Sequence, residues 1–457
     1  MEEAQASPLR RWARRLIENP LLRRVVRNSG YLFSANTAAA MFSMGQSALS
    51  ARLLGVAGFG VLGVITQFAT VLNGLTSFRM SQLVVSYVSQ FEAEGKERHA
   101  AAVFKGAGLA EMGSSLVAYA LVFALAPLGA RFLAHDPDTA NLFVIYGLMV
   151  LANLIAESAT GLLQVFNRFR LLAAITVGQS ALTLALIAVV FIFRGGLLGV
   201  LLAYLIGKAA WAGSITLAAL WHAGRRWGKG WWRAPLSLLA DRRRELFNFA
   251  LNTNVTTTLN LVTRDSELLW LSAFSTSEQV GYYKVALAIR NILVNPVDPL
   301  ISTTYREVAR EVANRRWANV RYLLRSGSLI SAAWTLPAML GLVVLGPWAI
   351  SLLWGPEFTP AYVSLLILLL GVGAVNIFYW NRNVLLPLGL PGYPTVVHLV
   401  AALVKTLGIF VFVPRTGAAG MAALLSGFYL GTAGALVLKT VQVLRRAESQ
   451  PAPAGSG

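Results

Sequence analysis

Long apolar runs are the feature that most restricts what this chain can fold into. Each run has roughly 20 residues, enough for an α-helix to cross a hydrocarbon layer about 30 Å thick. Hydrophobic residues make up 56% of the 457 residues and charged residues 13%, which is unusual for a soluble domain. The sequence therefore predicts an all-α polytopic membrane protein with about twelve spans. The expected spans are 31–51, 57–78, 103–127, 139–161, 171–193, 196–220, 246–271, 279–301, 326–350, 361–380, 391–413 and 417–439.

Basic residues lie unevenly between the apolar runs. They gather in the N-terminal segment, in the loops 79–105, 222–245 and 302–325, and in the tail, whereas the alternate loops carry few. By the positive-inside rule, these basic segments and both termini are expected in the cytoplasm, with the protein in a bacterial inner membrane. This placement explains the formal charge of +19 through topology, so nucleic acid is not expected as a partner.

Two halves of the sequence resemble each other at a nearly constant offset of about 220 residues, which indicates an internal duplication. An even number of spans per half, about six, gives parallel repeats related by a pseudo-two-fold axis along the membrane normal. Transporters use such repeats, with the substrate between the lobes and alternating access by rocking. The matching residues are Gly60 with Gly281, Ser81 with Ser302, Pro127 with Pro347, Arg194 with Arg415, and Asn167 with Asn381.

These features divide the chain into lobes and connecting segments. Residues 1–29 are expected to form a basic amphipathic segment on the membrane surface, or else a disordered basic tail. The first lobe is expected over 30–221 and the second over 246–440. The basic cytoplasmic loop 222–245 joins them, and 441–457 form a cytoplasmic tail.

Basic residues within or at the ends of the spans are the substrate-binding candidates. Ionisable groups inside a membrane cost several kcal/mol unless they face a cavity or a partner, and here the basic groups outnumber the acidic ones. Guanidinium and ammonium groups around a central cavity suit phosphate or pyrophosphate. The alternatives are structural ion pairs, positive-inside anchors for Arg79 and Arg382, and outer head-group contact for Arg52. The candidates are Arg52, Arg79, Lys208, Arg264, Lys284, Arg290, Arg382 and Lys405.

Acidic residues within the spans are candidates for ion coupling. Glu111, Glu157, Asp265 and Glu267 could carry H⁺ or Na⁺, although structural pairing explains each of them equally well. The membrane potential is a further energy source. Cysteine is absent and the four histidines lack ligand spacing, so neither a metal site nor a cofactor is expected.

Two short stretches resemble a known family. Residues 51–60 (ARLLGVAGFG) are similar to the signature after the first span of polysaccharide-transport flippases, in the multidrug, oligosaccharidyl-lipid and polysaccharide exporter superfamily. Residues 267–283 resemble the pattern at the seventh and eighth spans, although Leu268 stands where the family has a basic residue. The resemblance covers roughly residues 30 to 440 and implies a MATE-like fold.

The same resemblance implies a function and partners. A flippase of this family moves an undecaprenyl-pyrophosphate-linked oligosaccharide across the inner membrane by alternating access, for O-antigen, capsule or exopolysaccharide assembly. The glycolipid, membrane lipids, and polysaccharide polymerase and export proteins are the partners implied.

Three other functions compete with this interpretation. A lipid II flippase is chemically close, but that family usually has further C-terminal spans. A multidrug exporter of the same fold would favour an acidic cavity for its cationic drugs. A membrane glycan ligase or polymerase needs a sizeable outer loop with catalytic groups, which this sequence lacks, so no enzyme activity is expected.

Overall fold

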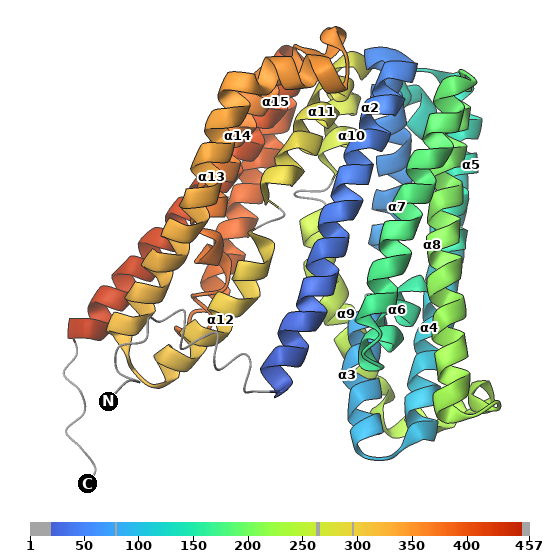
Figure 1. The fold of residues 1–457 in the computed structure, drawn as a ribbon, viewed down its shortest axis with the longest axis vertical. Coiled ribbons are helices and arrows are strands. Elements are labelled where there is room, and N and C mark those ends of the chain that lie inside the picture. The colour runs from blue at the N-terminus through green and yellow to red at the C-terminus, as the bar shows by residue number, and fades with distance from the viewer. Residues whose placement is uncertain (1–19, 78–79, 262–265, 295–296, 450–457) are drawn as a thin grey trace.

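The computed structural model describes residues 20–77, 80–261, 266–294 and 297–449, and all regular secondary structure in these ranges is helical. Seven described helices are long and apolar enough to cross a membrane by length and composition. Two of them, α2 and α15, fold back on themselves at a kink, so each crosses twice (Figure 1). The predicted all-α, polytopic membrane fold is confirmed.

The first lobe lies on the right of Figure 1 and the second on the left, and the helices follow the expected order of spans. The first lobe contains α2 (Pro20–Thr76), α3 (Met80–Ala93), α4 (Glu97–Gly129), η2 (Ala130–Ala134), η3 (Pro137–Thr139), α5 (Ala140–Ala152), α6 (Ala156–Val165), α7 (Phe169–Ile192) and α8 (Gly196–Trp227). The loop between the lobes holds η4 (Trp231–Arg233) and η5 (Leu236–Arg242). The second lobe contains α9 (Arg243–Asn260), α10 (Glu267–Phe274), α11 (Ser277–Val294), α12 (Asp298–Ala313), α13 (Trp317–Leu353), η7 (Pro356–Phe358), α14 (Ala361–Ile377), η8 (Tyr379–Arg382) and α15 (Gly392–Ser449).

Helix ends recur at equivalent places in the two lobes. Residues with a left-handed backbone end or kink helices, because this conformation stops the α-helical hydrogen-bond ladder. Glycine adopts it without strain, as at the kink of α2, where Gly55 has φ 68°. Several such residues lie about 220 positions apart, which supports the internal duplication: Gly95 and Arg315, His135 and Gly355, and Gly196 and Gly417.

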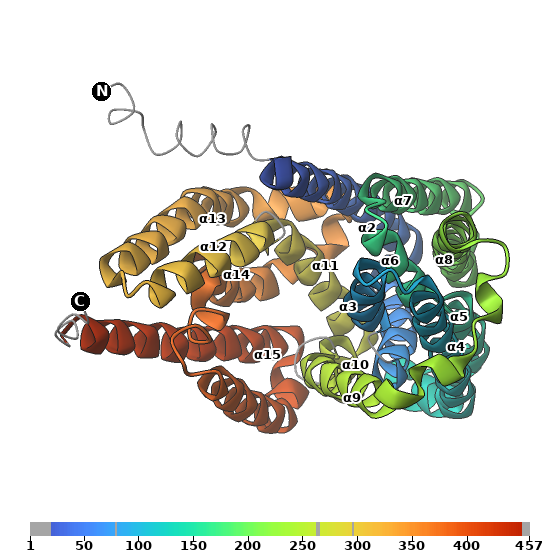
Figure 2. The same cartoon turned by 90° about the horizontal axis from the view of Figure 1, so that it is seen from below.

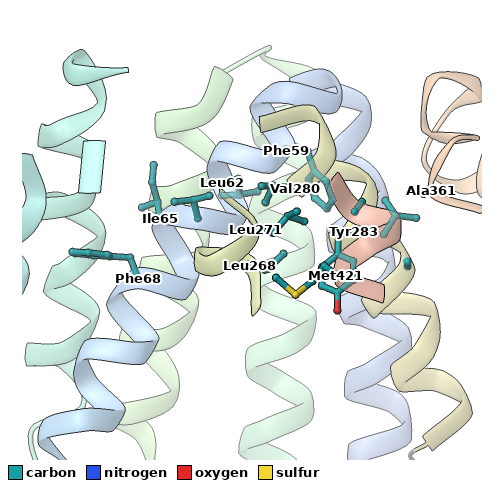
Figure 3. Packing of buried hydrophobic residues seen from close by; sticks show 14 of the residues in the cluster. Phe59, Leu62, Ile65, Phe68, Leu268, Leu271, Val280, Tyr283, Ala361 and Met421 are labelled. Atoms are coloured by element: carbon teal, nitrogen blue, oxygen red, sulfur yellow. The ribbon is translucent and has the colours of Figure 1, made fainter. Parts of the chain in front are cut away.

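The lobes meet at one end of the molecule. In Figure 1 this end lies at the top, opposite the end where α2 begins and α15 finishes, and we call it the sealed end. The opposite end, called the basic end, carries the C-terminal residues of α3 and the N-terminal residues of α4 and α13. Apolar side chains from both lobes form one core near the sealed end, including Phe59 and Leu62 of α2 and Val280 of α11 (Figure 3).

Three expected spans differ from the structure. The span 139–161 is broken into α5 and α6 by a turn at residues 153–155. The span 246–271 is divided into α9 and α10, and the first half packs with the first lobe, since Ala250 lies in the core around α3. The span 279–301 ends early, because α11 finishes at Val294 and α12 follows. Residues 20–29, expected as a surface segment, are continuous with α2.

Side chains satisfy the backbone groups that these breaks expose. A broken helix in an apolar layer leaves N–H and C=O groups that water cannot reach. Asn376 donates to the Leu293 carbonyl at the end of α11, at 2.8 Å. Gln279 accepts from the backbone N–H of Ala418, just after the kink of α15, at 3.0 Å.

The buried carboxylate of Glu111 on α4 caps the first turn of α6. It accepts from the backbone N–H groups of Glu157 and Ser158, at 2.8 and 2.9 Å, and from the Ser158 hydroxyl at 2.7 Å. The first N–H groups of a helix have no partner within the helix, and its dipole favours a negative charge there. Glu111 therefore holds the two parts of the broken span together. Of the two roles that the sequence analysis considered for it, ion coupling and structural pairing, the contacts described here are structural.

Replacing this cap should destabilise the first lobe. We expect Glu111→Ala to lower the free energy of unfolding by about 2–4 kcal/mol, because two buried N–H groups lose their acceptor. Thermal unfolding in detergent would measure it, with Glu97→Ala, an exposed acid on the same helix, as control. Equal unfolding midpoints for the two variants would contradict the capping role.

Candidate functional site

The contact between α2 and α11 joins the lobes at the sealed end, and glycine permits it. A Cβ added to Gly60 would lie 1.9 Å from the Ser277 carbonyl oxygen, and one added to Gly281 would lie 2.4 Å from that of Val56. No side chain fits in either place. The two backbones therefore touch directly, and we call this contact and its flanking residues the interlobe seam.

Lys284 crosses the interlobe seam from α11 to α2. Its ammonium lies 4.0 Å from the centroid of the Phe59 ring and donates a long hydrogen bond of 3.5 Å to the Phe59 carbonyl. Its methylene stem lies against Gly63. On its other side, Phe59 meets Phe358 edge to face, with the ring centroids 5.8 Å apart. A half-buried cation is thus held by a ring and a carbonyl.

Arg52 also joins the lobes at the sealed end. Its guanidinium donates to the carbonyls of Leu352 and Leu353 at the end of α13, the second at 3.0 Å. The last carbonyls of a helix lack partners within it and carry partial negative charge, so they suit a cation. Beside them, the Trp354 indole donates to the Ser47 hydroxyl at 3.0 Å.

A buried ion pair lies inside the second lobe. Lys405 of α15 contacts Glu267 at the start of α10, and both side chains are 4% exposed. The Tyr283 hydroxyl of α11 donates to the other Glu267 oxygen at 2.7 Å, and Figure 3 shows this tyrosine among the core residues. The group therefore links three helices of one lobe. Of the alternatives for Lys405, the structure shows ion pairing in this conformation.

Among the described residues, the two remaining candidate cations make no ion pair. Arg290 is half-buried on α11 and donates to the Asn291 side-chain oxygen at 2.9 and 3.3 Å. Lys208 is an exposed side chain on α8, with its ammonium 5.8 Å from the Trp211 ring. Arg52, Lys208, Lys284 and Lys405 thus each have a different set of contacts, and a cationic cavity shared by them stays a prediction. Arg79 and Arg264, and the side chain of Arg382, lie outside the described residues.

The acidic candidates have structural partners where the structure describes them. Glu111 caps α6, and Glu267 pairs with Lys405. Glu157 donates its backbone N–H to Glu111, and its side chain is half-buried. Asp265 lies outside the described residues. Within the described ranges, no group of three His, Cys, Asp or Glu side chains could hold a metal ion.

Several residues of the seam and of the buried group around Glu267 were not among the sequence candidates. Phe59 and Tyr283 belong to the stretches that carry the family resemblance, but an apolar or aromatic residue gives no signal of its contact. In the sequence, Gly60 and Gly281 were recognised only as matching positions of the two repeats. That match indicates that they are equivalent in the two lobes, and it does not indicate that they are in contact. Their proximity arises because the two halves fold face to face.

Solved structures share this architecture over nearly the whole chain. The lipid II flippase MurJ, in an inward closed conformation, superposes with a TM-score of 0.71 at 15% identity, covering 91% of this chain and 89% of that one. An inward-facing multidrug resistance MATE family transporter of the MOP superfamily gives 0.67 at 12% identity, over 90% and 95%. A substituted MATE transporter VcmN from Vibrio cholerae gives 0.61 at 16% identity, over 93% and 97%.

The sequence comparison identifies the family. The fold, two helical lobes joined at one end, is the MATE-like fold of polytopic membrane transporters. A family model described as polysaccharide biosynthesis protein matches residues 25–305. The chain belongs to this polysaccharide biosynthesis protein family, and the resemblance inferred from its short motifs is confirmed. No curated protein matches the sequence.

Bulk at the interlobe seam should separate the lobes. We expect Gly60→Val to open the sealed end, because its side chain would overlap the Ser277 carbonyl. Since the chain has no cysteine, Ser47→Cys can report on opening through its reaction rate with a water-soluble maleimide. The rate should rise several-fold in Gly60→Val and stay unchanged in Gly213→Val, where the added atoms meet open space. The same rate in both variants would argue against the seam.

The buried pair should be strongly coupled. Glu267→Gln or Lys405→Met alone should destabilise the protein by about 3–5 kcal/mol, because each leaves an uncompensated buried charge. The double variant should lose much less than the sum, measured as a double-mutant cycle of unfolding in detergent. The exposed Glu94–Lys96 pair, at 2.8 Å, is the control and should contribute about 1 kcal/mol or less. Additive losses at Glu267 and Lys405 would disprove the coupling.

Proposed function

We propose that this protein is a flippase that moves an undecaprenyl-pyrophosphate-linked oligosaccharide across the bacterial inner membrane. Membership of the polysaccharide biosynthesis protein family carries the proposal. The two-lobed transporter fold supports it, since lobes that meet at one end can rock to expose a site alternately to each side. The product would serve O-antigen, capsule or exopolysaccharide assembly, with a polysaccharide polymerase and export proteins as partners.

The orientation follows from the charges at the two ends. We place the basic end, with both termini, in the cytoplasm, because basic loops are retained on that side. The interlobe seam then closes the periplasmic side. Arg52 and Lys284 would be released when the seam opens, and they would then be available to an anionic head group.

Arg290 is the residue that we expect to contact the pyrophosphate. It lies on α11, the helix of the second lobe that packs against α2 of the first. Within the described residues its guanidinium is hydrogen-bonded to a neutral amide and makes no ion pair with a carboxylate. A guanidinium can bind two phosphate oxygens at once.

The pair of Glu267 and Lys405 is our candidate for coupling to H⁺, Na⁺ or the membrane potential. It lies buried within one lobe and joins α10 to α15. A proton or cation that replaced one partner of the pair would change how these helices are held. Drug export remains the competing function, because MATE transporters share the fold.

Transport should be measured in proteoliposomes with three probes. The first is a fluorescent polyprenyl-pyrophosphate oligosaccharide, the second is lipid II, and the third is a cationic dye. Flipping of the first probe in preference to the others is the expected result. Preference for lipid II or for the dye would assign the protein to one of the competing functions.

Loss of the Arg290 charge should abolish most of this transport. Arg290→Ala should slow flipping about tenfold or more, since a hydrogen bond to a charged group is worth about 1.5–3 kcal/mol. Arg290→Lys, which keeps the charge, should retain part of the rate. Arg316→Ala, at an exposed site of the basic end, should flip normally. Undiminished flipping by Arg290→Ala would remove this residue from the site.

A further inference from the structure

A groove of about 490 Å³ lies in the second lobe near the basic end. It is lined by α13 and the final part of α15, and Figure 2 shows these helices on the side of the second lobe away from the first. Leu329 and Val441 line it and are 62% and 39% exposed. The groove is therefore apolar, and in a membrane it faces lipid and not the space between the lobes.

Three arginines stand where the groove reaches the basic end: Arg321, Arg325 and Arg445. All are exposed, and one acid, Glu448, pairs with Arg321. The guanidinium groups of Arg325 and Arg445 have no ion pair among the described residues. The site thus combines an apolar channel with a positive rim at the level of the head groups.

Part of the equivalent region in the first lobe is covered by protein, although Leu109 and Trp221, the counterparts of Leu329 and Val441, are 49% and 51% exposed. There Phe104 packs against Trp227, the last residue of α8, and against Trp231 of the loop between the lobes, with ring centroids 6.2 and 5.4 Å apart. The neighbouring Lys105 donates to the Ala234 carbonyl at 3.2 Å. These contacts cover Phe104, and the loop carbonyl of Ala234 satisfies the cation.

The duplication relates the two places. Phe104 and Lys105 correspond to Leu324 and Arg325, each about 220 positions later, and both later residues line the groove. Leu324 is buried in one cluster with Trp380, which also lines the groove, whereas Arg325 is exposed. Residues 450–457, which are not described, contain neither an acidic nor a large apolar side chain. What covers the groove must therefore bring its own apolar chain and negative charge.

We propose that this groove binds one anionic phospholipid of the cytoplasmic leaflet. Its phosphate lies between Arg325 and Arg445, and an acyl chain lies along Leu329 and Val441. A phospholipid has both features that the site lacks, a negative head group beside an apolar chain.

Native mass spectrometry of the purified full chain tests the proposal by titration with phosphatidylglycerol, phosphatidylcholine and polyprenyl phosphate. We expect one phosphatidylglycerol to be retained in preference to the other two. Arg325→Ala/Arg445→Ala should weaken its binding at least about tenfold, because two charge-assisted contacts are lost. Val441→Trp, which fills the channel but keeps both arginines, should weaken it similarly. Arg310→Ala/Arg316→Ala, which removes two exposed arginines elsewhere in the same lobe, should bind normally.

Four results would overturn this assignment. Unchanged phosphatidylglycerol binding in the Arg325→Ala/Arg445→Ala variant would remove the head-group site. Normal binding in Val441→Trp would show surface charge attraction without a groove. Stronger retention of polyprenyl phosphate would make the groove a site for another lipid. Increased lipid binding by a chain ending at Ser449 would show that the final segment occupies the groove.

Discussion

The structure depends on how backbone groups are satisfied where helices break inside the apolar layer. An unbroken helix satisfies its own N–H and C=O groups, but a break leaves several without a partner or water. Glu111, Gln279 and Asn376 meet this need, each from a helix other than the one it caps. The same residues therefore fix which helices lie side by side. A transporter fold needs breaks in order to bend, and these polar contacts make the breaks stable.

The charged contacts within a lobe differ in kind from the charged contacts between the lobes, which rocking of the lobes would break. The strongest interaction, between Glu267 and Lys405, lies within one lobe, so rocking of the lobes need not break it. Contacts between the lobes are weaker, since Arg52 and Lys284 meet carbonyls and an aromatic ring and not carboxylates. Separating an ion pair in an apolar layer costs far more than releasing a cation from neutral groups. The seam can thus close one end of the protein and still open at moderate cost.

Much of the fold could be predicted from the sequence, because membrane spans depend on local composition. The spans, the duplication and the family followed from runs of apolar residues and short motifs. The break at 153–155 did not, since a broken span keeps the hydrophobicity of an intact one. The break after Asn260 was missed although α9 is polar for a membrane span.

The partners of the charges could not be predicted for a different reason. Glu267 and Lys405 lie 138 residues apart, and the helices between them decide that they meet. Arg52 binds main-chain carbonyls, a contact for which no residue type gives a signal. Sequence reasoning recognised that each charge needs a partner or a cavity, and it could not choose between the two.

The duplication explains why one position carries different residues in the two lobes. Glu111 on α4 corresponds to Ser331 on α13, about 220 positions later. In the first lobe, a helix begins beside this position and presents N–H groups, so an acceptor is needed. In the second lobe, α14 ends there, and the Ser331 hydroxyl donates to the Asn376 carbonyl at 2.6 Å. The two repeats therefore keep the contact and exchange acceptor for donor, because the direction of the backbone at the break decides which is required.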